Sequence, residues 1–447
     1  MAIKVGMVSL GCSKNQVDSE IMLSLIRKGG YELCTDSGMC DVVIINTCGF
    51  IEEAKRESIE NILEFCTLKK EGRIKAVVVT GCLSERYREE VAKEIPEADV
   101  ILGIGKNSEI VSAIERALKG ETVVEFGDKR DLPLSGERII SNLPFFAYLK
   151  IADGCSNRCS YCAIPMIRGD YRSRAIEDVV AEGWWLAHHG VREINIVAQD
   201  PTRYGEDLYG KPRLCSLLRE LCKIDGIRWI RLLYLYPERI SDELIALMAE
   251  QREKIVPYID MPIQHCNHEI LRRMNRPGGR EALEALVGKL RAGIPGVVLR
   301  TTLICGFPGE TEEQFEELCD FARRMQFERL GCFAYSPEEG TPAAEFDGQL
   351  DGERKSRRCE VIMDQQMEIM DRFNRSKIGQ TLEVAVEGYD RYAGSYFGRS
   401  YMDAPDIDTK TFFQSDSPLS IGDFVPVRIE DTIDCDLYGT VAGEAAE

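Results

Sequence analysis

The chain has 447 residues, 44% of them hydrophobic and 29% charged, so it can bury more than one core and suggests about three domains. Its formal net charge of −19 opposes broad attraction to a phosphate backbone and suits a basic protein partner better. No basic segment leads into an apolar stretch at the N-terminus, and no later apolar run reaches spanning length, so we expect neither secretion nor membrane insertion. The 17 cysteines then favour reduced thiols or metal ligands over disulfides, and the cytoplasm is the expected compartment.

The first region alternates short β-branched strands with helices. This alternation predicts a parallel α/β sheet domain over residues 1–120. Strands are expected at 4–10, 41–47 and 74–80, and helices at 18–27 and 52–65. Charges, glycines and prolines then crowd together, which predicts a linker over residues 121–140.

Six strand-like segments alternate with helices across residues 141–373 and predict an open, partial (β/α)6 barrel. They are 145–151, 193–198, 229–235, 256–261, 298–305 and 329–335. After a charged helical stretch at 353–375, residues 374–447 return to strands without helices. Those strands, at 381–387, 394–399, 424–430 and 438–441, predict a small antiparallel β-barrel. The overall fold class is therefore α/β with a C-terminal barrel.

Cys155, Cys159 and Cys162 form a CxxxCxxC pattern in a loop directly after the first barrel strand. Three thiolates from one tight loop can hold three irons of a 4Fe-4S cluster and leave the fourth iron open. Because such barrels bind substrates at the carboxyl ends of their strands, the open iron can coordinate a ligand and pass it an electron. A structural zinc site is the alternative, but zinc sites favour paired CxxC motifs and no second pair follows nearby.

The pattern, with Tyr161 before its last cysteine, resembles the signature of the radical S-adenosylmethionine superfamily. The resemblance implies a 4Fe-4S cluster on the three cysteines, with the open iron chelating S-adenosylmethionine, whose reductive cleavage releases a 5′-deoxyadenosyl radical. With Tyr161, the expected cofactor contacts at later strand ends are Gln199, Asp200, Gly306, Gly309 and Glu310. Asp200 and Glu310 could instead cap the helices that follow them.

Histidines offer few further candidates. His265 follows a strand end that faces the predicted cavity, and it is the one candidate catalytic residue beyond the cluster ligands. His188 and His189 lie on a predicted helix and are expected at its surface.

Cys12, Cys48 and Cys82 each follow a predicted parallel strand of the first domain. Because the carboxyl ends of parallel strands converge on one crevice, these single cysteines can meet and hold a second cluster. The alternative is that they are ordinary core residues, since buried cysteine is common. The chain has other cysteines on predicted helices, among them Cys215, Cys222, Cys319 and Cys359.

The motifs LGCSKNQVDSE, IINTCGF and TGCLSERY resemble the N-terminal domain of the methylthiotransferase family. The resemblance implies that the second cluster carries or receives a sulfur, that one S-adenosylmethionine methylates it, and that another supplies the radical. A radical is needed because the C–H bond of an sp3 carbon resists acid-base activation. Asn15, Asp18 and Glu20 in the first motif either orient the crevice or, for Asp18, start a helix.

The tail helps to choose the substrate. From Asn374 to Glu447 it carries 6 Lys and Arg against 14 Asp and Glu, a formal charge of −8, which repels phosphate and suits a basic ribosomal protein. YLKIADGCSNRCSYCAIPMIRGDYRSR, LLYLYPERISDELI, FAYSPEEGTPAA and GRSYMDAPDID resemble the ribosomal-protein branch of the family, and the tail resembles a TRAM barrel. Tyr392, Tyr396 and Phe397 either stack on bases or pack in the barrel core.

The branch implies a methylthio group added to the β-carbon of a conserved aspartate of ribosomal protein uS12. It also implies two 4Fe-4S clusters, S-adenosylmethionine, and an electron donor such as flavodoxin or ferredoxin; we expect a monomer with no primary contact to nucleic acid. Two alternatives stay open: a transfer-RNA methylthiotransferase acting on a modified adenosine, and a non-catalytic iron-sulfur scaffold. The first would leave its product in RNA, and the second would release no 5′-deoxyadenosine.

Overall fold

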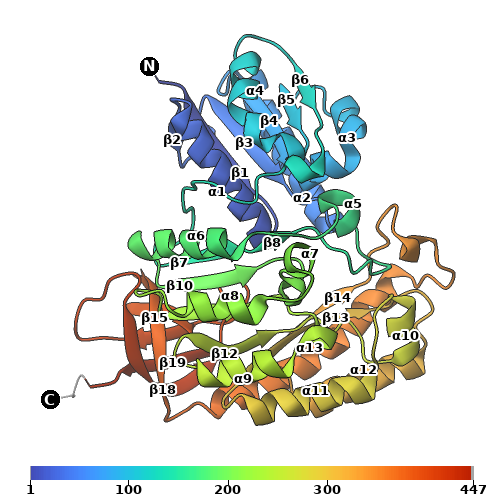
Figure 1. Cartoon of the computed structure of the whole chain (residues 1–447), viewed down its shortest axis with the longest axis vertical. Helices are drawn as coiled ribbons and strands as arrows, with labels where there is room; N and C mark the ends of the chain where they lie inside the picture. Colours follow the sequence, from blue (N-terminus) through green and yellow to red (C-terminus); the bar gives the residue numbers. More distant parts are fainter. Residues whose placement is uncertain (1, 444–447) are drawn as a thin grey trace. The chain divides into compact units, whose positions relative to one another are not determined.

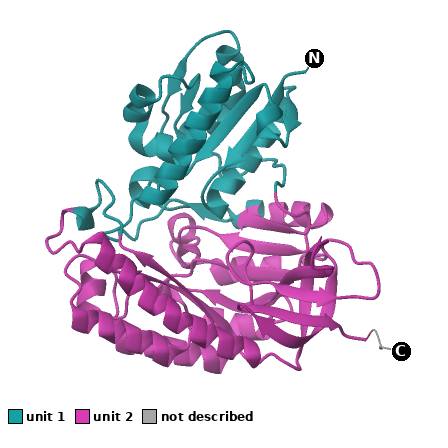
Figure 2. Ribbon diagram, turned by 180° about the vertical axis from the view of Figure 1, so that it is seen from behind, with its two compact units in different colours: residues 1–141, 150–178, 336–344 teal, residues 142–149, 179–335, 345–447 magenta. Residues whose placement is uncertain are grey.

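The computed structural model describes residues 2–443, which form two compact units (Figures 1 and 2). The first unit contains the chain up to Ser141, Lys150–Asp178 and Ser336–Ala344. The second contains Asn142–Leu149, Val179–Tyr335 and the chain from Glu345 onward. In the part of the chain described, no helix has both the length and the apolar character needed to cross a bilayer.

The first unit is built on a sheet of six parallel strands in the order β2-β1-β3-β4-β5-β6. The strands are β1 (Lys4–Ser9), β2 (Glu32–Cys34), β3 (Val42–Thr47), β4 (Ala76–Gly81), β5 (Val100–Leu102) and β6 (Val123–Glu125). The helices are α1 (Ser13–Lys28), α2 (Glu52–Lys70), α3 (Cys82–Glu94), α4 (Ile110–Ala117) and α5 (Ile164–Arg168). A small antiparallel pair, β8 (Ala152–Asp153) with β9 (Arg172–Ser173), also belongs to this unit.

Helices cover both faces of this sheet (Figure 1). Every residue of β3 and β4 is buried, as expected for central parallel strands rich in valine and isoleucine. Ile44 and Val78 pack in a core with α1 and α4, whereas Ile45 and Val79 point to the other face and pack with α2. Burying each such side chain stabilises the fold by about 1.5–3 kcal/mol.

The strand order reverses direction between β1 and β3. In an open parallel sheet such a reversal leaves a crevice beyond the carboxyl ends of the two strands, where ligands bind. Cys12 follows β1, Cys48 follows β3, and Cys82 follows β4. The topology thus puts Cys12 and Cys48 at the switch point and Cys82 at the end of the adjacent strand.

The second unit contains an open sheet with the sequential order β14-β13-β12-β11-β10-β7, whose neighbours from β10 to β14 are parallel. Its strands are β7 (Phe146–Lys150), β10 (Glu193–Val197), β11 (Trp229–Leu232), β12 (Ile255–Asp260), β13 (Val298–Cys305) and β14 (Arg329–Ala334). The helices are α6 (Ile176–His188), α7 (Glu206–Tyr209), α8 (Leu214–Leu221), α9 (Asp242–Glu250), α10 (His268–Arg273), α11 (Arg280–Gly293), α12 (Glu312–Met325) and α13 (Gly352–Arg375). This is the predicted six-strand, partial barrel.

The tail forms a closed five-stranded barrel in the order β15-β16-β17-β19-β18. Its strands are β15 (Thr381–Asp390), β16 (Ser395–Ser400), β17 (Thr411–Gln414), β18 (Phe424–Ile433) and β19 (Asp436–Val441). The prediction of a wholly antiparallel barrel is wrong in one respect, because β17 and β19 pair in parallel. Tyr396 stacks on the buried Phe413, with ring centroids 6.0 Å apart. Phe397, the next residue on β16, points to the opposite face, where it lies 6.1 Å from Phe412 and is half-buried, so the core-packing interpretation is wrong for Phe397. Tyr392 is fully exposed, and the core-packing interpretation is wrong for it as well.

Several short elements differ from the sequence prediction. The strands β2, β5, β6 and β17 were not predicted, because three or four residues carry too little periodicity to be recognised. One of them, β6, lies within the segment 121–140 predicted as a linker and pairs with β5. Helix α1 begins at Ser13, earlier than the predicted start at Asp18. The domain boundaries at 1–120, 141–373 and 374–447 stay predictions.

Candidate active site

The loop that carries Cys155, Cys159 and Cys162 is pinned at its base. Strands β8 and β9 pair across it, and the Cys155 N–H donates to the carbonyl oxygen of Gly169 at 3.0 Å. Gly154 has a φ of +75°, and a Cβ there would lie 2.2 Å from the Asp170 carbonyl oxygen, so only glycine fits the entry to the loop. Within it, the Cys162 N–H donates to the Cys159 carbonyl at 3.1 Å and forms a tight turn.

All three of these cysteines are partly exposed. Three accessible sulfur donors on one constrained loop fit a cubane cluster better than a buried structural ion, because one side of the bound group stays open. Their role as ligands stays a prediction.

The cysteines that follow β1, β3 and β4 lie on chain segments that approach one another closely. A Cβ on Gly11, next to Cys12, would lie 3.0 Å from the Cys48 Sγ. A Cβ on Gly49, next to Cys48, would lie 2.8 Å from the carbonyl carbon of Cys82. Burial and the neighbouring Cys82 and Cys12 raise the pKa of the Cys48 thiol to about 12. The three strand ends therefore converge as the parallel topology predicts.

Arg168, on α5, donates to several groups of the first unit. Its Nη1 lies 2.6 Å from Asp18 Oδ2 and 2.9 Å from Asp153 Oδ2, and its Nη2 lies 3.5 Å from the Cys82 Sγ. Lys150 also pairs with Asp153, at 3.1 Å, and with Asp18. All four charged side chains are buried.

This network connects both predicted ligand sets. Asp153 stands two residues before Cys155, whereas Arg168 contacts Cys82 directly. Although desolvation opposes ionisation, Arg168 and Lys150 hold the pKa of Asp153 well below its ordinary value, so the carboxylate stays charged. None of the three charged residues Arg168, Lys150 and Asp153 was predicted from the sequence to be functional. The only sequence feature that could have indicated them is that these three charged residues flank the CxxxCxxC motif.

Asn15, Asp18 and Glu20 lie inside α1. Asp18 is buried in the ion-pair network, so the interpretation that it starts the helix is wrong. The Asn15 Nδ2 donates to the carbonyls of Leu10 at 2.7 Å and Asn46 at 3.3 Å, and so joins the ends of β1 and β3. Glu20 pairs with Arg138 at 2.9 Å. The interpretation that these side chains orient the crevice stays a prediction.

Gly306 and Glu310 lie in the turn after β13. The Gly306 N–H donates to Glu310 Oε2 at 3.0 Å, and Arg358 pairs with Glu310 Oε1 at 2.5 Å. Glu310 is not the helix cap, because Thr311 caps α12 with a capping box completed by Gln314. Asp200, by contrast, does cap the short helical turn Pro201–Arg203, where it accepts from the Thr202 N–H at 3.1 Å.

Gly306 and Gly309 both have positive φ, +73° and +77°. Side chains of the chain itself come close to them: a Cβ would lie 2.2 Å from Lys355 Cγ at Gly306 and 2.0 Å from Arg273 Nη1 at Gly309. Tyr161 and Gln199 are half-buried. Contact of these residues with S-adenosylmethionine stays a prediction.

His265 is fully buried in the second unit. Its Nδ1 accepts from the Asn267 N–H at 2.9 Å, and its Nε2 lies 3.6 Å from Glu310 Oε2 without a hydrogen bond among the described residues. His188 and His189 are exposed at the end of α6, as predicted.

A third group of cysteines was not predicted. Among the described residues, the thiol sulfurs of Cys305, Cys332 and Cys359 lie within 4.8 Å of one another. Cys359 was interpreted only as one of several helix cysteines. No local pattern links these positions, because the sheet register brings them together.

Comparisons with known proteins agree with this architecture. Family models match residues 4–103 (uncharacterized protein family UPF0004), residues 149–322 (radical SAM superfamily) and residues 378–442 (TRAM domain).

The solved radical S-adenosylmethionine methyltransferase TsrM from Kitasatospora setae, with cobalamin and a [4Fe-4S] cluster, has a TM-score of 0.58 at 16% identity, covering 77% of each chain. The cobalamin-dependent S-adenosylmethionine radical enzyme OxsB has a TM-score of 0.51 at 14% identity, covering 81% of this chain and 56% of its own. At such identities the likeness shows the fold alone. The fold and the family matches define a radical S-adenosylmethionine enzyme.

Curated relatives are much more similar. The ribosomal protein uS12 methylthiotransferase RimO of Pelotomaculum thermopropionicum is 51% identical over 441 residues, covering 98% of this chain and 99% of the relative. The protein of the same name from Thermoanaerobacter sp. strain X514 is 49% identical over 436 residues, covering 97% and 99%. The chain belongs to the RimO family of methylthiotransferases. The transferase class and the requirement for 4Fe-4S clusters and S-adenosylmethionine are thereby confirmed.

Proposed function

We propose that this chain adds a methylthio group to the β-carbon of a conserved aspartate of ribosomal protein uS12. The observation that carries the proposal is the near-full-length similarity, about half of all positions, to proteins named for that activity. The convergence of three single cysteines at the carboxyl ends of adjacent strands of the first sheet supports it, because sulfur insertion needs a second cluster besides the one that serves S-adenosylmethionine.

In this proposal, Cys155, Cys159 and Cys162 hold one cluster, and Cys12, Cys48 and Cys82 hold the other. When bound, a cluster with an open iron supplies the electron for reductive cleavage of S-adenosylmethionine. The candidate contacts for the cofactor are Tyr161, Gln199, Asp200, Gly306, Gly309 and Glu310, with His265 beside Glu310.

The chain's own polar groups have supporting roles. The N–H of Arg168 that points at the Cys82 sulfur orients this side chain and stabilises negative charge on it. Asn15 fixes the separation of the β1 and β3 ends and therefore the spacing between Cys12 and Cys48. These residues act through the cysteines and are positioning residues.

The barrel supports a basic protein substrate. The exposed charged side chains in the described part of the tail are six acidic ones, Asp406, Asp416, Asp423, Glu430, Asp431 and Asp434, against four basic ones, Arg375, Arg391, Lys410 and Arg428. Such a surface attracts a basic ribosomal protein and repels a phosphate backbone. We further propose that the protein works in the cytoplasm as a monomer, with a low-potential donor such as flavodoxin or ferredoxin.

The test is an anaerobic assay with reconstituted protein, S-adenosylmethionine, a reductant and uS12, offered free and within the small ribosomal subunit. Mass spectrometry of the uS12 peptide should detect the methylthio adduct on aspartate. Cys12→Ala and Cys155→Ala should abolish the adduct, whereas Cys215→Ala, on α8 and outside both sets, should keep it.

The other two functions predict different products. A methylthioadenosine in transfer RNA with an unmodified uS12 peptide would replace this proposal with the RNA-modifying alternative. Bound clusters with no release of 5′-deoxyadenosine under reduction would indicate a scaffold instead.

A further inference from the structure

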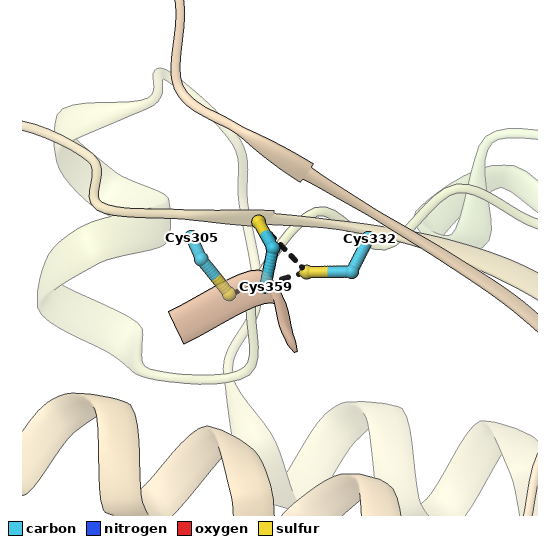
Figure 3. Close-up of side chains that lie close together, drawn as sticks. All are labelled: Cys305, Cys332 and Cys359. Atoms are coloured by element: carbon cyan, nitrogen blue, oxygen red, sulfur yellow. Dashed lines mark hydrogen bonds between the residues drawn. The ribbon is translucent and has the colours of Figure 1, made fainter. Parts of the chain in front are cut away.

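Three cysteines of the second unit meet away from both predicted ligand sets. Cys305 ends β13, Cys332 lies in β14, and Cys359 lies in α13. The sulfur of Cys332 is 3.3 Å from that of Cys305 and 3.5 Å from that of Cys359, and all three sulfurs lie within 4.8 Å of one another (Figure 3). We call this group the β13–β14–α13 thiol cluster.

The fold explains why these thiols converge. Cys332 pairs with Leu303, and because side chains alternate along a strand, Cys305 points to the same face of the sheet as Leu303 and Cys332. Helix α13 packs against both strands. Figure 3 shows that Cys359 points toward the two strand cysteines.

Two contacts hold α13 in this position. Lys355, one turn before Cys359, donates from Nζ to the Tyr335 carbonyl at 2.9 Å, just after β14. Arg358, the neighbour of Cys359, pairs with Glu310 at 2.5 Å, just after β13. The helix is thus tied to the ends of both strands that supply the other thiols, and the cluster is preorganised.

A disulfide between the two strand cysteines does not fit this register. Their positions are diagonal, one strand apart and two residues along, which separates the Cα atoms by about 8 Å. A disulfide seldom spans more than about 7 Å between Cα atoms. Bridging them would therefore require the backbone to move.

Three converging thiols do fit a metal ion. In a tetrahedral zinc site with Zn–S bonds of about 2.3 Å, the sulfurs lie about 3.8 Å apart. The two separations that involve Cys332, 3.3 Å and 3.5 Å, are close to this value, and no separation exceeds 4.8 Å. Cys305 is buried, whereas Cys332 and Cys359 are half-buried, so two of the three residues are partly accessible to solvent.

We propose that Cys305, Cys332 and Cys359 form a three-thiolate site for a zinc ion, with the fourth position taken by water. Binding releases the thiol protons to solvent and changes no oxidation state. The ion would clamp the edge strand β14 to β13 and to α13. The site would be distinct from the six cysteines assigned to the iron-sulfur clusters, and it does not depend on the proposed function.

The experiment uses the holoprotein with its iron and sulfide reconstituted, so that the six cluster cysteines are occupied. After incubation with Zn2+ and removal of loosely held ions with a weak chelator, iron and zinc are counted by mass spectrometry. Zinc-edge X-ray absorption then identifies the ligands without interference from iron. We expect about one zinc per chain with sulfur neighbours at about 2.3 Å.

Cysteine substitutions test whether the zinc ion is bound at this cluster. Cys359→Ala and Cys332→Ala, both at half-buried positions, should lower zinc to near zero and leave iron unchanged. Cys319→Ala, at a half-buried position on the adjacent helix α12, should keep the zinc. Because Cys305→Ala removes a core side chain, the milder Cys359→Ala carries the main test. Unchanged iron content shows that the variants are folded.

Zinc that persists in the Cys332→Ala and Cys359→Ala proteins would overturn the proposal. So would zinc with only nitrogen or oxygen neighbours, a Cys332–Cys359 disulfide found in the purified protein, or no zinc retained by the unaltered chain. A second readout is thermal: zinc should raise the unfolding temperature of the unaltered protein and of Cys319→Ala, and leave that of Cys359→Ala unchanged.

Discussion

The guanidinium of Arg399 on β16 lies 2.8 Å from the carboxylate of Glu193 on β10, and both side chains are buried. Glu193 also accepts from Arg231 on β11 at 3.0 Å. A buried, hydrogen-bonded charge pair therefore joins the C-terminal barrel to the six-stranded sheet within the second unit. Removing Arg399 would leave the buried Glu193 carboxylate with Arg231 as its one remaining cation, in a medium that solvates charge poorly.

Arg399→Met should accordingly destabilise the second unit by about 3–5 kcal/mol. Urea unfolding followed by tryptophan fluorescence can measure this, since Trp229 lies edge-on to Phe424 of the barrel at 4.7 Å. The matched control is Arg228→Met, which removes an exposed contact of 2.8 Å to Glu383 of the same barrel. An exposed pair contributes about 0–1 kcal/mol, so equal effects of the two substitutions would contradict this prediction.

Glu193 also gives a pH dependence. Desolvation acts to raise its pKa, but Arg399 and Arg231 outweigh that effect and hold the pKa below the ordinary value of 4.5. Because the folded pKa is depressed, its stabilisation is complete above pH 4.5 and is lost as the pH falls through the folded value. The stability difference between the unaltered protein and Glu193→Gln should therefore be constant near neutrality and shrink only in acid. A difference that shrinks between pH 8 and pH 6 would refute this assignment.

Gly154→Ala tests the entry to the Cys155 loop. The added methyl would lie 2.2 Å from the Asp170 carbonyl at a φ of +75°, so the loop must shift. If Cys155, Cys159 and Cys162 hold one of two clusters, reconstituted protein should lose about half of its iron. The comparison is Gly190→Ala, at a φ of +87° with no atom within 4 Å of the added methyl, which carries only backbone strain of about 1–2 kcal/mol. Full iron content in Gly154→Ala would show that the loop geometry is not needed.

Arg168→Met removes the cation shared by Asp18, Asp153 and the Cys82 sulfur while keeping a long side chain. We expect weaker retention of the second cluster, by roughly 10- to 100-fold, and a more negative reduction potential, because a hydrogen bond to sulfur is lost. Redox titration followed by EPR measures the potential. Arg168→Lys should restore part of both properties.

The control for Arg168 is Arg158→Met, which breaks an exposed pair with Asp170 of 2.6 Å on the same loop. That exposed pair contributes little to stability. The iron retention and the reduction potential of the cluster should therefore stay as in the unaltered protein. If Arg168→Met lowers stability but leaves the potential unchanged, the residue is structural only.

The elements predicted correctly are those whose signal is local. Strands β3 and β4 are fully buried and rich in β-branched residues. Such runs predict parallel strands from local sequence alone. The six strands of the second sheet follow the same logic, and family membership confirms the radical S-adenosylmethionine class. The short strand β17 was missed because four residues between turns leave almost no pattern.

Polar side chains were harder to place, since their partners are distant in sequence. Asp18 looked like a helix start, yet its partner Lys150 lies 132 residues further along the chain. The zinc candidates depend on the register of β13 against β14 and on which face α13 covers, and neither can be derived from cysteine spacing. Local sequence determines whether a segment is a helix or a strand, whereas tertiary packing determines which side chains it contacts.

The ring of strands formed by β15, β16, β17, β19 and β18 has a consequence for recognition. Each of these strands, over the residues the structure describes, has a hydrogen-bonded neighbour on both sides. A guest polypeptide therefore has no backbone rim to which it could add as a sixth strand, the route by which many sheets capture peptides and by which exposed sheets aggregate. A partner that binds this barrel must therefore be recognised by the side chains and turns of the barrel. Single substitutions at those positions can change specificity without disturbing the strand pairing.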